Sequence, residues 1–440
     1  MDILIITTFY PPDTTIAAVR PYMFAKYLAE RGHHVTVLRS GEFYNMPSDY
    51  FNMDIPVRVI SYLGEDSPAE RYARGVRENF QTTAWESRIS FLPERIRSPI
   101  SKVYNFFMRS RNLEKRIAEI AYKFEKQKTA LDALKNEHFD VVFSTFGQEE
   151  NIAAGQYAAK LFGCKLVQDF RDAVATKARQ KGKQFRYYKN LHNEAVRNAD
   201  GCTAVSDGLL QELLDGLDTV PPGMVLYNGF EPITDVSGEE NAEPGVLSIC
   251  YTGSVYSELQ DFTPLLRALR KLGEEKRLDL DKVKLHYAGK DFSLLYEAAK
   301  RSGVENILED HGYVSRTEAA RIQSMSDLFL VLSWNMKESQ GILTGKFFEG
   351  IRAKKPMLSV INGSLPNSEL NMLNEKYHYG FCYESCREKE QFGALCDYLA
   401  KAYDEKMKLG KVQYEMNPEL ETRFRYDALA EQLEHFIEQL

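Results

Sequence analysis

The chain has 440 residues, which at about 100 to 200 residues per domain predicts two or three domains. Hydrophobic residues make up 44% and charged residues 27% of the sequence, which excludes a mainly disordered, collagenous or coiled-coil chain. The 56 Lys and Arg against 63 Asp and Glu give a net charge of −7. This balance argues against a dedicated nucleic-acid-binding protein, because such domains are usually basic.

Six cysteines are scattered along the chain, and their spacing fits neither a disulfide framework nor a paired metal-binding knuckle. We therefore expect reduced, mostly buried thiols. The first residues lead directly into an apolar strand without a basic region, and no run of about 18 apolar residues occurs. These features predict a cytoplasmic protein.

Short apolar runs alternate with helical patterns along the first half of the chain, which is typical of βαβ units and parallel sheets. A helix is expected over residues 17–30, because its pattern ends in Arg31 and Gly32, a basic last turn followed by a glycine. Strands are expected at 3–6, 35–38, 57–62, 141–144, 166–168, 203–205 and 225–227.

Residues 231–245 interrupt the alternation. Their sequence, EPITDVSGEENAEPG, holds five acidic residues, no basic one, two prolines and two glycines, so it does not easily form a buried element. The alternation then resumes, with strands expected at 247–251, 284–287, 328–332, 357–360 and 381–383 and a final helix over about 421–439.

This pattern predicts an α/β protein with two doubly wound, Rossmann-like domains facing each other across a cleft, where ligands would bind outside the carboxyl ends of the strands. The expected N-terminal domain covers 1–232 and the linker 233–245. The expected C-terminal domain covers 246–415, and a helical segment over 416–440 is expected to pack back on the N-terminal domain.

The first strand ends in Thr7-Thr8-Phe9-Tyr10-Pro11-Pro12, where a dinucleotide-binding fold would carry G-x-G-x-x-G. A nicotinamide or flavin site is therefore not expected at this turn. No GxxxxGK[ST] sequence appears either, so a P-loop nucleotide site is not expected.

The stretch 341–351, GILTGKFFEGI, follows one expected strand and precedes another, and it predicts a short helix beginning near Thr344. Free N–H groups at such a helix start favour an anion such as a diphosphate, and Lys346 would add a full charge. Glu349 shares a helix face with Lys346 and could accept hydrogen bonds from both hydroxyls of a ribose. An ordinary amphipathic helix with a solvated Lys–Glu pair explains the same spacing.

The same stretch resembles the "TGK-x-F-E-Y-L" variant of the donor-site motif in retaining glycosyltransferases of family 4, the glycosyltransferase group 1 type, which have the GT-B fold. Individually weak matches follow in the family's order along nearly the whole chain. They are Pro11-Pro12 with Arg20, Asp169-Phe170-Arg171-Asp172, Ala199-Asp200 with Ala204-Val205-Ser206, Asn228-Gly229-Phe230, Tyr251-Thr252-Gly253-Ser254, Ala288-Gly289 and His311-Gly312-Tyr313-Val314.

The resemblance implies transfer of a sugar from a nucleotide-diphosphate donor to an acceptor hydroxyl with the anomeric configuration retained. It implies catalytic roles for Lys346, Glu349, Arg171 and Asp172, and acceptor-side roles for Pro12 and Arg20. Glu149 stands just past the strand ending at Ser144 and could also contact the acceptor, with a solvated loop residue as the alternative. No cofactor or metal is expected, since no Asp-x-Asp stands at a strand end. The donor-binding residues implied are Gly253, Ser254, His311, Gly312, Tyr313, Gly341, Ile342, Leu343, Thr344, Gly345, Lys346 and Glu349.

Two positions depart from the family pattern. The earlier glutamate of the usual E-x7-E pair falls on Gly341, so its contact would have to come from backbone groups of Gly341 and Ile342 or from Glu338. The residues directly after Gly253, Ser-Val-Tyr-Ser-Glu-Leu-Gln-Asp, include no basic one. The donor phosphates would then be stabilised by Lys346, by the helix N-terminus at Thr344 and Gly345, and by the Gly253 amide.

Residues 88–116 carry eight basic residues against two acidic ones, with apolar and aromatic residues between them. Such a mixture suits an anionic bilayer surface, where an isoprenoid-linked glycan acceptor would be presented. A helical insertion whose apolar side packs on the N-terminal domain is the alternative. The basic residues are Arg88, Arg95, Arg97, Lys102, Arg109, Arg111, Lys115 and Arg116.

Three functions remain open from the sequence. The first is a glycosyltransferase that extends a bacterial surface polysaccharide. The second is a nucleotide-sugar epimerase of the same fold, and the third is a sugar-nucleotide-binding scaffold without turnover, which the glycine at position 341 would favour. The sugar, the nucleotide, the acceptor and the oligomeric state do not follow from the sequence.

Overall fold

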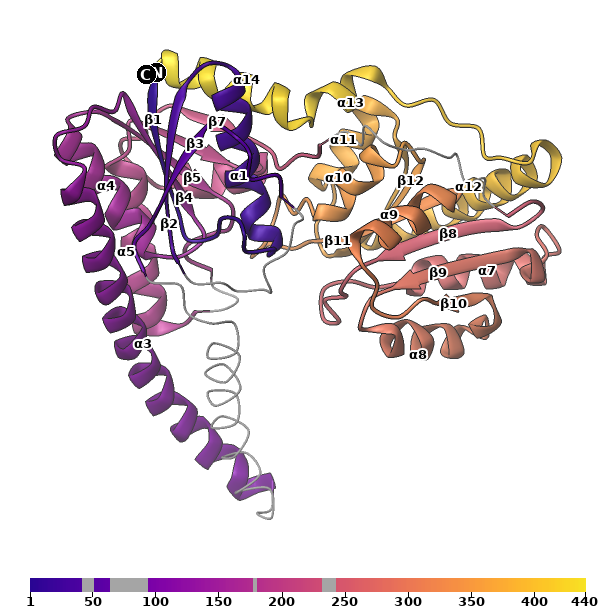
Figure 1. Cartoon of the computed structure of the whole chain (residues 1–440). Coiled ribbons are helices and arrows are strands. Elements are labelled where there is room, and N and C mark those ends of the chain that lie inside the picture. The colour runs from indigo at the N-terminus through magenta and orange to yellow at the C-terminus, as the bar shows by residue number, and fades with distance from the viewer. Residues whose placement is uncertain (42–50, 64–93, 177–179, 232–242) are drawn as a thin grey trace. The chain divides into compact units, whose positions relative to one another are not determined.

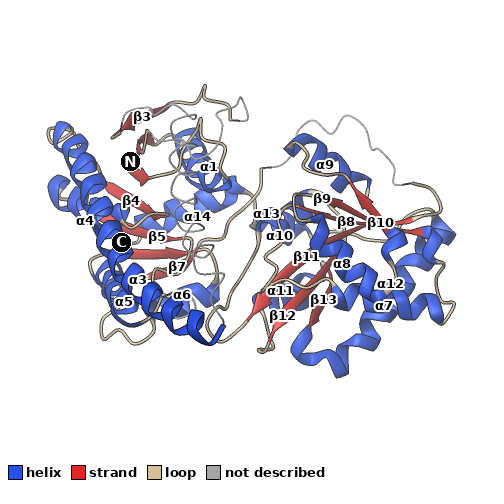
Figure 2. Ribbon diagram, turned by 90° about the horizontal axis from the view of Figure 1, so that it is seen from below, coloured by secondary structure: helices blue, strands red, loops and turns tan. Residues whose placement is uncertain are grey.

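The computed structural model describes residues 1–41, 51–63, 94–176, 180–231 and 243–440. The chain divides into two compact units, each a parallel sheet with helices packed around it (Figures 1 and 2). Unit 1 comprises Met1–Val205, Leu210–Leu226 and Ala430–Leu440, and unit 2 comprises Ser206–Leu209 and Tyr227–Leu429.

Unit 1 contains a seven-stranded parallel sheet in the order β3-β2-β1-β4-β5-β6-β7. The chain builds this sheet outward from β1 first in one direction and then, from β4 on, in the other, so the strand order reverses between β1 and β4. The strands are β1 (Asp2–Thr7), β2 (His34–Arg39), β3 (Val57–Ser61), β4 (Val141–Phe146), β5 (Lys165–Phe170), β6 (Gly201–Ala204) and β7 (Gly223–Val225).

The central strands of this sheet are continuous apolar runs because both faces are covered by helices. Ile3, Ile5 and Val142 are fully buried, for example. Helix α4 packs on β4, and the C-terminal part of α3 packs on α4, while Figure 1 shows the N-terminal part of α3 continuing past the rest of unit 1. The helices of unit 1 are α1 (Ile16–Glu30), α3 (Glu94–Ala133), α4 (Glu150–Phe162) and α5 (Gly182–Arg197). Helices α6 (Asp207–Leu214) and α14 (Tyr426–Glu438) begin in residues of unit 2 and end in unit 1.

Unit 2 contains a six-stranded parallel sheet in the order β10-β9-β8-β11-β12-β13. Its strands are β8 (Leu247–Thr252), β9 (Val283–Ala288), β10 (Leu308–Asp310), β11 (Leu328–Asn335), β12 (Met357–Gly363) and β13 (Gly380–Glu384). Its helices are α7 (Thr263–Glu274), α8 (Phe292–Ser302), α9 (Arg316–Met325), α10 (Gly345–Arg352), α11 (Glu369–Tyr377), α12 (Glu388–Leu409) and α13 (Pro418–Arg423). Buried residues of β8, β9 and β11 join those of α7 and α12 in one core.

The predicted α/β architecture of two doubly wound sheets is confirmed. The structure adds β10, a three-residue edge strand that the sequence did not indicate, and places β7 two residues earlier than predicted. The predicted domain boundaries remain predictions, because most of the expected linker lies outside the described residues. The first part of the basic stretch 88–116 also lies outside them, and 94–116 belong to α3.

The single helix predicted over 421–439 is wrong, since α13 and α14 are separate helices. Between them the backbone of residues 424–426 pairs with Phe230: the Phe230 N–H donates to the Phe424 carbonyl (3.0 Å) and the Tyr426 N–H donates to the Phe230 carbonyl (3.2 Å). These bonds require an extended segment at Arg425, so a helix cannot continue through it.

In the part of the chain that the structure describes, none of the helices combines the length and the apolar composition needed to cross a bilayer.

Candidate donor-binding site

Three glycines of unit 2 follow adjacent strands and pack against one another at the carboxyl edge of the sheet. The Gly253 N–H donates to the Ala288 carbonyl (2.7 Å), and the Gly289 N–H donates to the Gly312 carbonyl (2.8 Å). A Cβ atom at position 289 would lie 2.3 Å from the Gly253 carbonyl oxygen, so only glycine fits there. The three loops therefore form one backbone surface beside which side chains from other elements can gather.

The N-terminus of α10 opens at the same edge, because α10 follows the loop after β11. Thr344 is the N-cap residue, but its side chain makes no capping bond, and its Oγ1 is buried without a hydrogen-bond partner. The helix begins with Gly345, and the Phe347 N–H returns to the Thr344 carbonyl (3.0 Å). An uncapped helix start with an unpaired hydroxyl is suited to an anionic ligand, which would accept these hydrogen bonds.

Lys346 and Glu349 lie one turn apart on α10 and form a close ion pair. The Lys346 Nζ is 2.6 Å from each carboxylate oxygen of Glu349. Both side chains are mostly covered, with exposed fractions of 20% and 25%. A Cβ atom at position 253 would lie 2.8 Å from Lys346 Cε and 3.2 Å from its Nζ, so the glycine leaves the space in which the lysine side chain lies.

Glu349 also contacts two residues outside α10, Gln323 and Thr252. Gln323, on α9, is 1% exposed, and its Nε2 donates to Glu349 Oε2 (2.7 Å) and to Thr252 Oγ1 (2.7 Å). The Gln323 Oε1 accepts a hydrogen bond from Arg352 (3.0 Å), and Thr252 Oγ1 is 3.5 Å from Glu349 Oε2. Thr252 belongs to the recognised Tyr-Thr-Gly-Ser segment, whereas no sequence signal pointed to Gln323.

The expectation that the Gly253 amide helps to neutralise the phosphates is wrong for this arrangement. That N–H is committed to the Ala288 carbonyl at 2.7 Å. Gly253 instead contributes its missing side chain, which makes room for Lys346. Ser254, the next residue, is exposed, and its carbonyl accepts a hydrogen bond from the Tyr251 hydroxyl (2.9 Å).

Gly341 has no room for a side chain. Its φ is +68°, and a Cβ atom there would lie 2.7 Å from Ser206 Oγ, 2.9 Å from Gly208 Cα and 3.0 Å from Glu369 Oε2. The Glu369 carboxylate is already engaged by the N–H groups of Asp207 (3.0 Å) and Gly208 (3.4 Å). Glycine at position 341, where the family that the sequence resembles carries a glutamate, is therefore a packing requirement of this chain.

The groups expected to replace that glutamate are only partly available. The Ile342 carbonyl accepts a hydrogen bond from Ser333 (2.8 Å), and Glu338 is exposed on a turn closed by Met336 and Ser339. The flanking Leu343 is half-buried between Ile342 and the N-cap of α10.

His311 and Tyr313 follow β10 and lie at the surface. The His311 Nε2 is 3.0 Å from the Nδ1 of His286, and burial together with this neighbour lowers the pKa of His286. Tyr313 is 87% exposed, so it is not part of the core.

Arg20, Arg171 and Asp172, which the sequence predicted as site residues, belong to unit 1. Arg20 is 2% exposed and forms a forked pair with Asp169, at 2.7 and 3.1 Å, so its side chain is a buried structural element and not an exposed acceptor contact. Arg171 donates to the Ala17 carbonyl (2.8 Å), and Asp172 beside it is exposed.

The other acceptor-side residues are Glu149 and Pro12. Glu149 accepts a hydrogen bond from the Tyr188 hydroxyl (3.0 Å) and pairs with Arg116 of α3, so it is not a solvated loop residue. Pro12 is half-buried and follows a cis peptide bond between Pro11 and Pro12.

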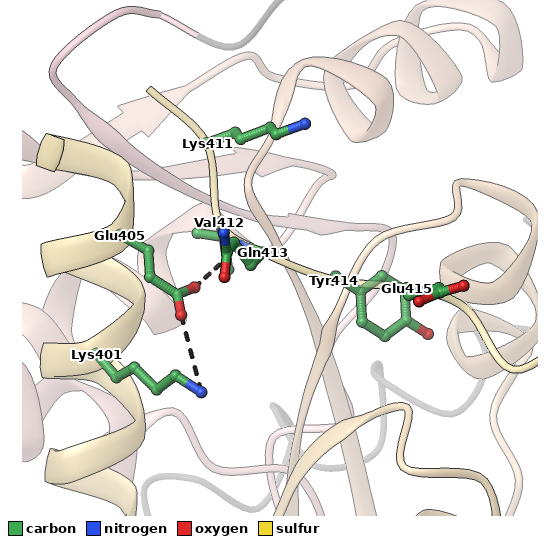
Figure 3. Close-up of a pocket in the computed structure, with 7 residues that line it drawn as sticks. All are labelled: Lys401, Glu405, Lys411, Val412, Gln413, Tyr414 and Glu415. Carbon is green, nitrogen blue, oxygen red and sulfur yellow. Dashed lines mark hydrogen bonds and ion pairs between the residues drawn. The ribbon is translucent and has the colours of Figure 1, made fainter. Parts of the chain in front are cut away.

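Unit 2 has a hollow of about 500 Å³ beside the C-terminal part of α12. The residues that line it are drawn in Figure 3. Glu405 accepts a hydrogen bond from the Gln413 N–H there (2.9 Å) and lies 3.8 Å from Lys401. None of the predicted site residues lines this hollow. Its lining residues are Lys401, Glu405, Lys411, Val412, Gln413, Tyr414 and Glu415.

No family model matches this sequence, and no curated protein matches it either. Similarity appears among solved structures. The chain is similar over 100% of both lengths to the apo form of the lipopolysaccharide outer core galactosyltransferase WaaB, with 13% identity and a TM-score of 0.55. Sucrose-phosphate synthase from Thermosynechococcus elongatus has 12% identity and a TM-score of 0.58, with 100% of this chain and 99% of that chain covered.

A third similar structure is Anabaena HepE in complex with UDP and glucose, with 11% identity, a TM-score of 0.56 and complete coverage of both chains. At this level of identity the similarity establishes the fold. The chain has the GT-B fold of two Rossmann-like sheets.

Proposed function

We propose that this chain is a retaining glycosyltransferase that moves a sugar from a nucleotide-diphosphate donor to a hydroxyl of a lipid-linked glycan during surface polysaccharide synthesis. The observation that carries the proposal is the Lys346–Glu349 pair at the uncapped start of α10, against Gly253. The GT-B fold supports it, and so does the Anabaena HepE structure, which holds UDP and glucose.

The donor would bind with its diphosphate at the N-terminus of α10. Thr344 Oγ1 and the first N–H groups of the helix would donate hydrogen bonds to phosphate oxygens, and Lys346 would turn from Glu349 to the phosphates. Glu349 would then accept hydrogen bonds from the ribose. In the free protein the two groups satisfy each other, at 2.6 Å, so neither charge is left uncompensated before the donor arrives.

The reaction breaks the bond between the anomeric carbon and the diphosphate oxygen and forms a bond from that carbon to the acceptor oxygen. The acceptor proton passes to the departing diphosphate, so the step balances without a protein base. Negative charge grows on the leaving oxygens, and Lys346 with the α10 N-terminus would stabilise it. Arg171 and Asp172 of unit 1 keep their proposed catalytic roles, while Pro12 and Glu149 are proposed to contact the acceptor.

Membrane contact through residues 94–116 of α3 is part of the proposal. In the sequence, Ile96, Ile100, Val103 and Phe107 recur at helical spacing, and seven basic residues occur in the same segment. An anionic bilayer would attract these charges by on the order of 1 kcal/mol each. The lipid carrier of the acceptor would be held at this surface.

The donor test is a thermal-shift screen with UDP-, GDP-, ADP- and CMP-linked sugars, since a ligand at 100 times its dissociation constant stabilises by about 2.7 kcal/mol. Lys346→Ala and Glu349→Ala should abolish the shift. Lys408→Ala and Asp404→Ala, which break an exposed ion pair of similar spacing on α12, should leave it unchanged. A full shift in both site variants would overturn the assignment of the site.

Release of free nucleoside diphosphate separates the three functions. A transferase releases it only when acceptor is added, whereas an epimerase converts the donor without acceptor and a scaffold binds the donor without either reaction.

Sedimentation with anionic liposomes tests the membrane contact. Replacing Arg95, Arg97 and Arg109 by Ser should reduce it at low salt, where surface charges are least screened. A control that replaces Arg267, Arg277 and Arg321 of unit 2 by Ser should behave as the native chain does. Equal sedimentation of both variants would reject the contact.

A further inference from the structure

We infer that Gln323 is a positioning residue for Glu349. Its hydrogen bond holds Oε2 of Glu349 and leaves Oε1 available to the donor. This inference rests on the proposed function of the same site. By orienting Glu349, Gln323, which lies outside the donor motif, would make the site selective for ribonucleotides over 2′-deoxyribonucleotides.

The two carboxylate oxygens of Glu349 have different hydrogen-bond partners. Oε2 accepts from Gln323 Nε2 (2.7 Å) and lies 3.5 Å from Thr252 Oγ1, in addition to its contact with Lys346. Among the described residues, Oε1 is reached by Lys346 alone (2.6 Å). When Lys346 turns to the diphosphate, Oε2 keeps its two protein partners while Oε1 loses its donor. A carboxylate oxygen has two lone pairs, so Oε1 can then accept both hydroxyls of a ribose.

Both polar atoms of the Gln323 side chain make hydrogen bonds. Its Oε1 accepts from Arg352 (3.0 Å), and its Nε2 donates both to Glu349 and to Thr252 (2.7 Å each). The side chain is 1% exposed, so water does not compete for these bonds. Because α9 and α10 each supply part of the network, the carboxylate plane of Glu349 is set before a ligand binds, which lowers the entropy lost on binding.

A ligand without the 2′-hydroxyl would leave one lone pair of Oε1 unsatisfied in a mostly covered site. Hydrogen bonds to charged groups contribute about 1.5 to 3 kcal/mol, which corresponds to roughly a tenfold or greater preference for the ribonucleotide. If Glu349 is free to rotate, either oxygen can meet a single hydroxyl, and this preference falls. The ratio of the two affinities therefore reports the orientation of Glu349.

The experiment measures dissociation constants by calorimetry for UDP, GDP and ADP and for their 2′-deoxy forms, with the native chain and with Gln323→Met. Methionine keeps the volume of glutamine but makes none of its hydrogen bonds. The nucleotide that the native chain binds should show at least about a tenfold preference for the ribose form. In Gln323→Met the preference should fall below about threefold, with weaker binding of the ribonucleotide.

Arg352→Leu removes only the hydrogen bond to Gln323 Oε1. It should lower the preference for the ribose form by a smaller amount than Gln323→Met, and it replaces that variant in the test if Gln323→Met does not fold. Arg321→Gln, an exposed change on the same helix, should leave the ratio unchanged. An unchanged ratio in both Gln323→Met and Arg352→Leu would overturn the inference, as would equal binding of both sugar forms by the native chain. Absence of binding to all three ribonucleotides would instead overturn the proposed function.

Discussion

Alanine at position 341 is expected to destabilise unit 2, although Gly341 replaces a glutamate of the family that the sequence resembles. The residue has φ +68°, a conformation that costs an L-residue about 1 to 2 kcal/mol. Its Cβ atom would also lie 2.9 Å from Gly208 Cα, which is backbone and cannot rotate away. Overpacking of this kind costs about 1 to 3 kcal/mol, so the expected loss is about 2 to 5 kcal/mol.

Gly410→Ala is the matched control. Gly410 is also in unit 2 and has φ +76°, but nothing lies within 4 Å of the position of its Cβ atom. This variant should lose only the backbone contribution of about 1 to 2 kcal/mol. Gly341→Glu should lose at least as much as Gly341→Ala, because its carboxylate would also approach that of Glu369.

The assay is denaturant unfolding followed by the fluorescence of Trp334, which lies on β11 of unit 2. The sequence has two tryptophans, so a Trp85→Phe background makes Trp334 the sole reporter. Free energies are compared at equal slope of unfolding against denaturant. Equal losses in Gly341→Ala and Gly410→Ala would refute the packing argument, and a more stable or more active Gly341→Glu would show that the site accepts the family's glutamate.

Three further predictions concern buried polar groups of unit 1. Glu150 is fully buried and neither carboxylate oxygen has a hydrogen-bond partner within the described residues. Burial raises its pKa, so the native chain loses stability as the pH rises above about 4.5. Glu150→Gln should therefore be more stable than the native chain at pH 8 but not at pH 4. The gain in unfolding free energy should be about 1.4 kcal/mol for each unit by which the pKa is raised. A difference in unfolding free energy that does not change with pH would contradict this. Burial lowers the pKa of His192 to about 4, so the native chain loses stability as the pH falls from 6.5 toward 4. His192→Gln should lack this loss, which is about 2.5 kcal/mol between pH 7.5 and 4.5, in an unfolding series over that range. Arg20→Met should lower the free energy of unfolding by about 3 to 5 kcal/mol, because it leaves Asp169 buried without its cation. In thermal unfolding, a double variant with Asp169→Asn should recover part of this loss if the two residues act as a unit.

The order of strands and helices followed from local pattern. Strands buried on both faces read as continuous apolar runs, so 3–6, 141–144 and 328–332 could be identified from the sequence. The helix starting after Thr344 and the shared face of Lys346 and Glu349 also followed, because helical spacing is a property of neighbouring residues. The edge strand β10 was missed because three residues carry too little periodic signal.

Contacts between distant segments were decided by the tertiary structure. The sheet order β10-β9-β8-β11 brings Gly253, Gly289 and Gly312 together, and no local pattern encodes that order. The same holds for Gln323, which is 26 residues from Glu349 in the chain and 2.7 Å from it in space. The final helix was predicted as continuous because its interruption depends on the backbone of Phe230, far away in sequence.

The sequence by itself determined the α/β elements and which residue types stand at their ends, because hydrophobic period and helix-terminus chemistry act over a few residues. Only the tertiary structure decided that Arg20 is buried against Asp169, that the Gly253 amide is already bonded, and that Gly341 cannot carry a side chain. The physical reason is that burial and hydrogen-bond partners depend on which segments the sheet order places side by side.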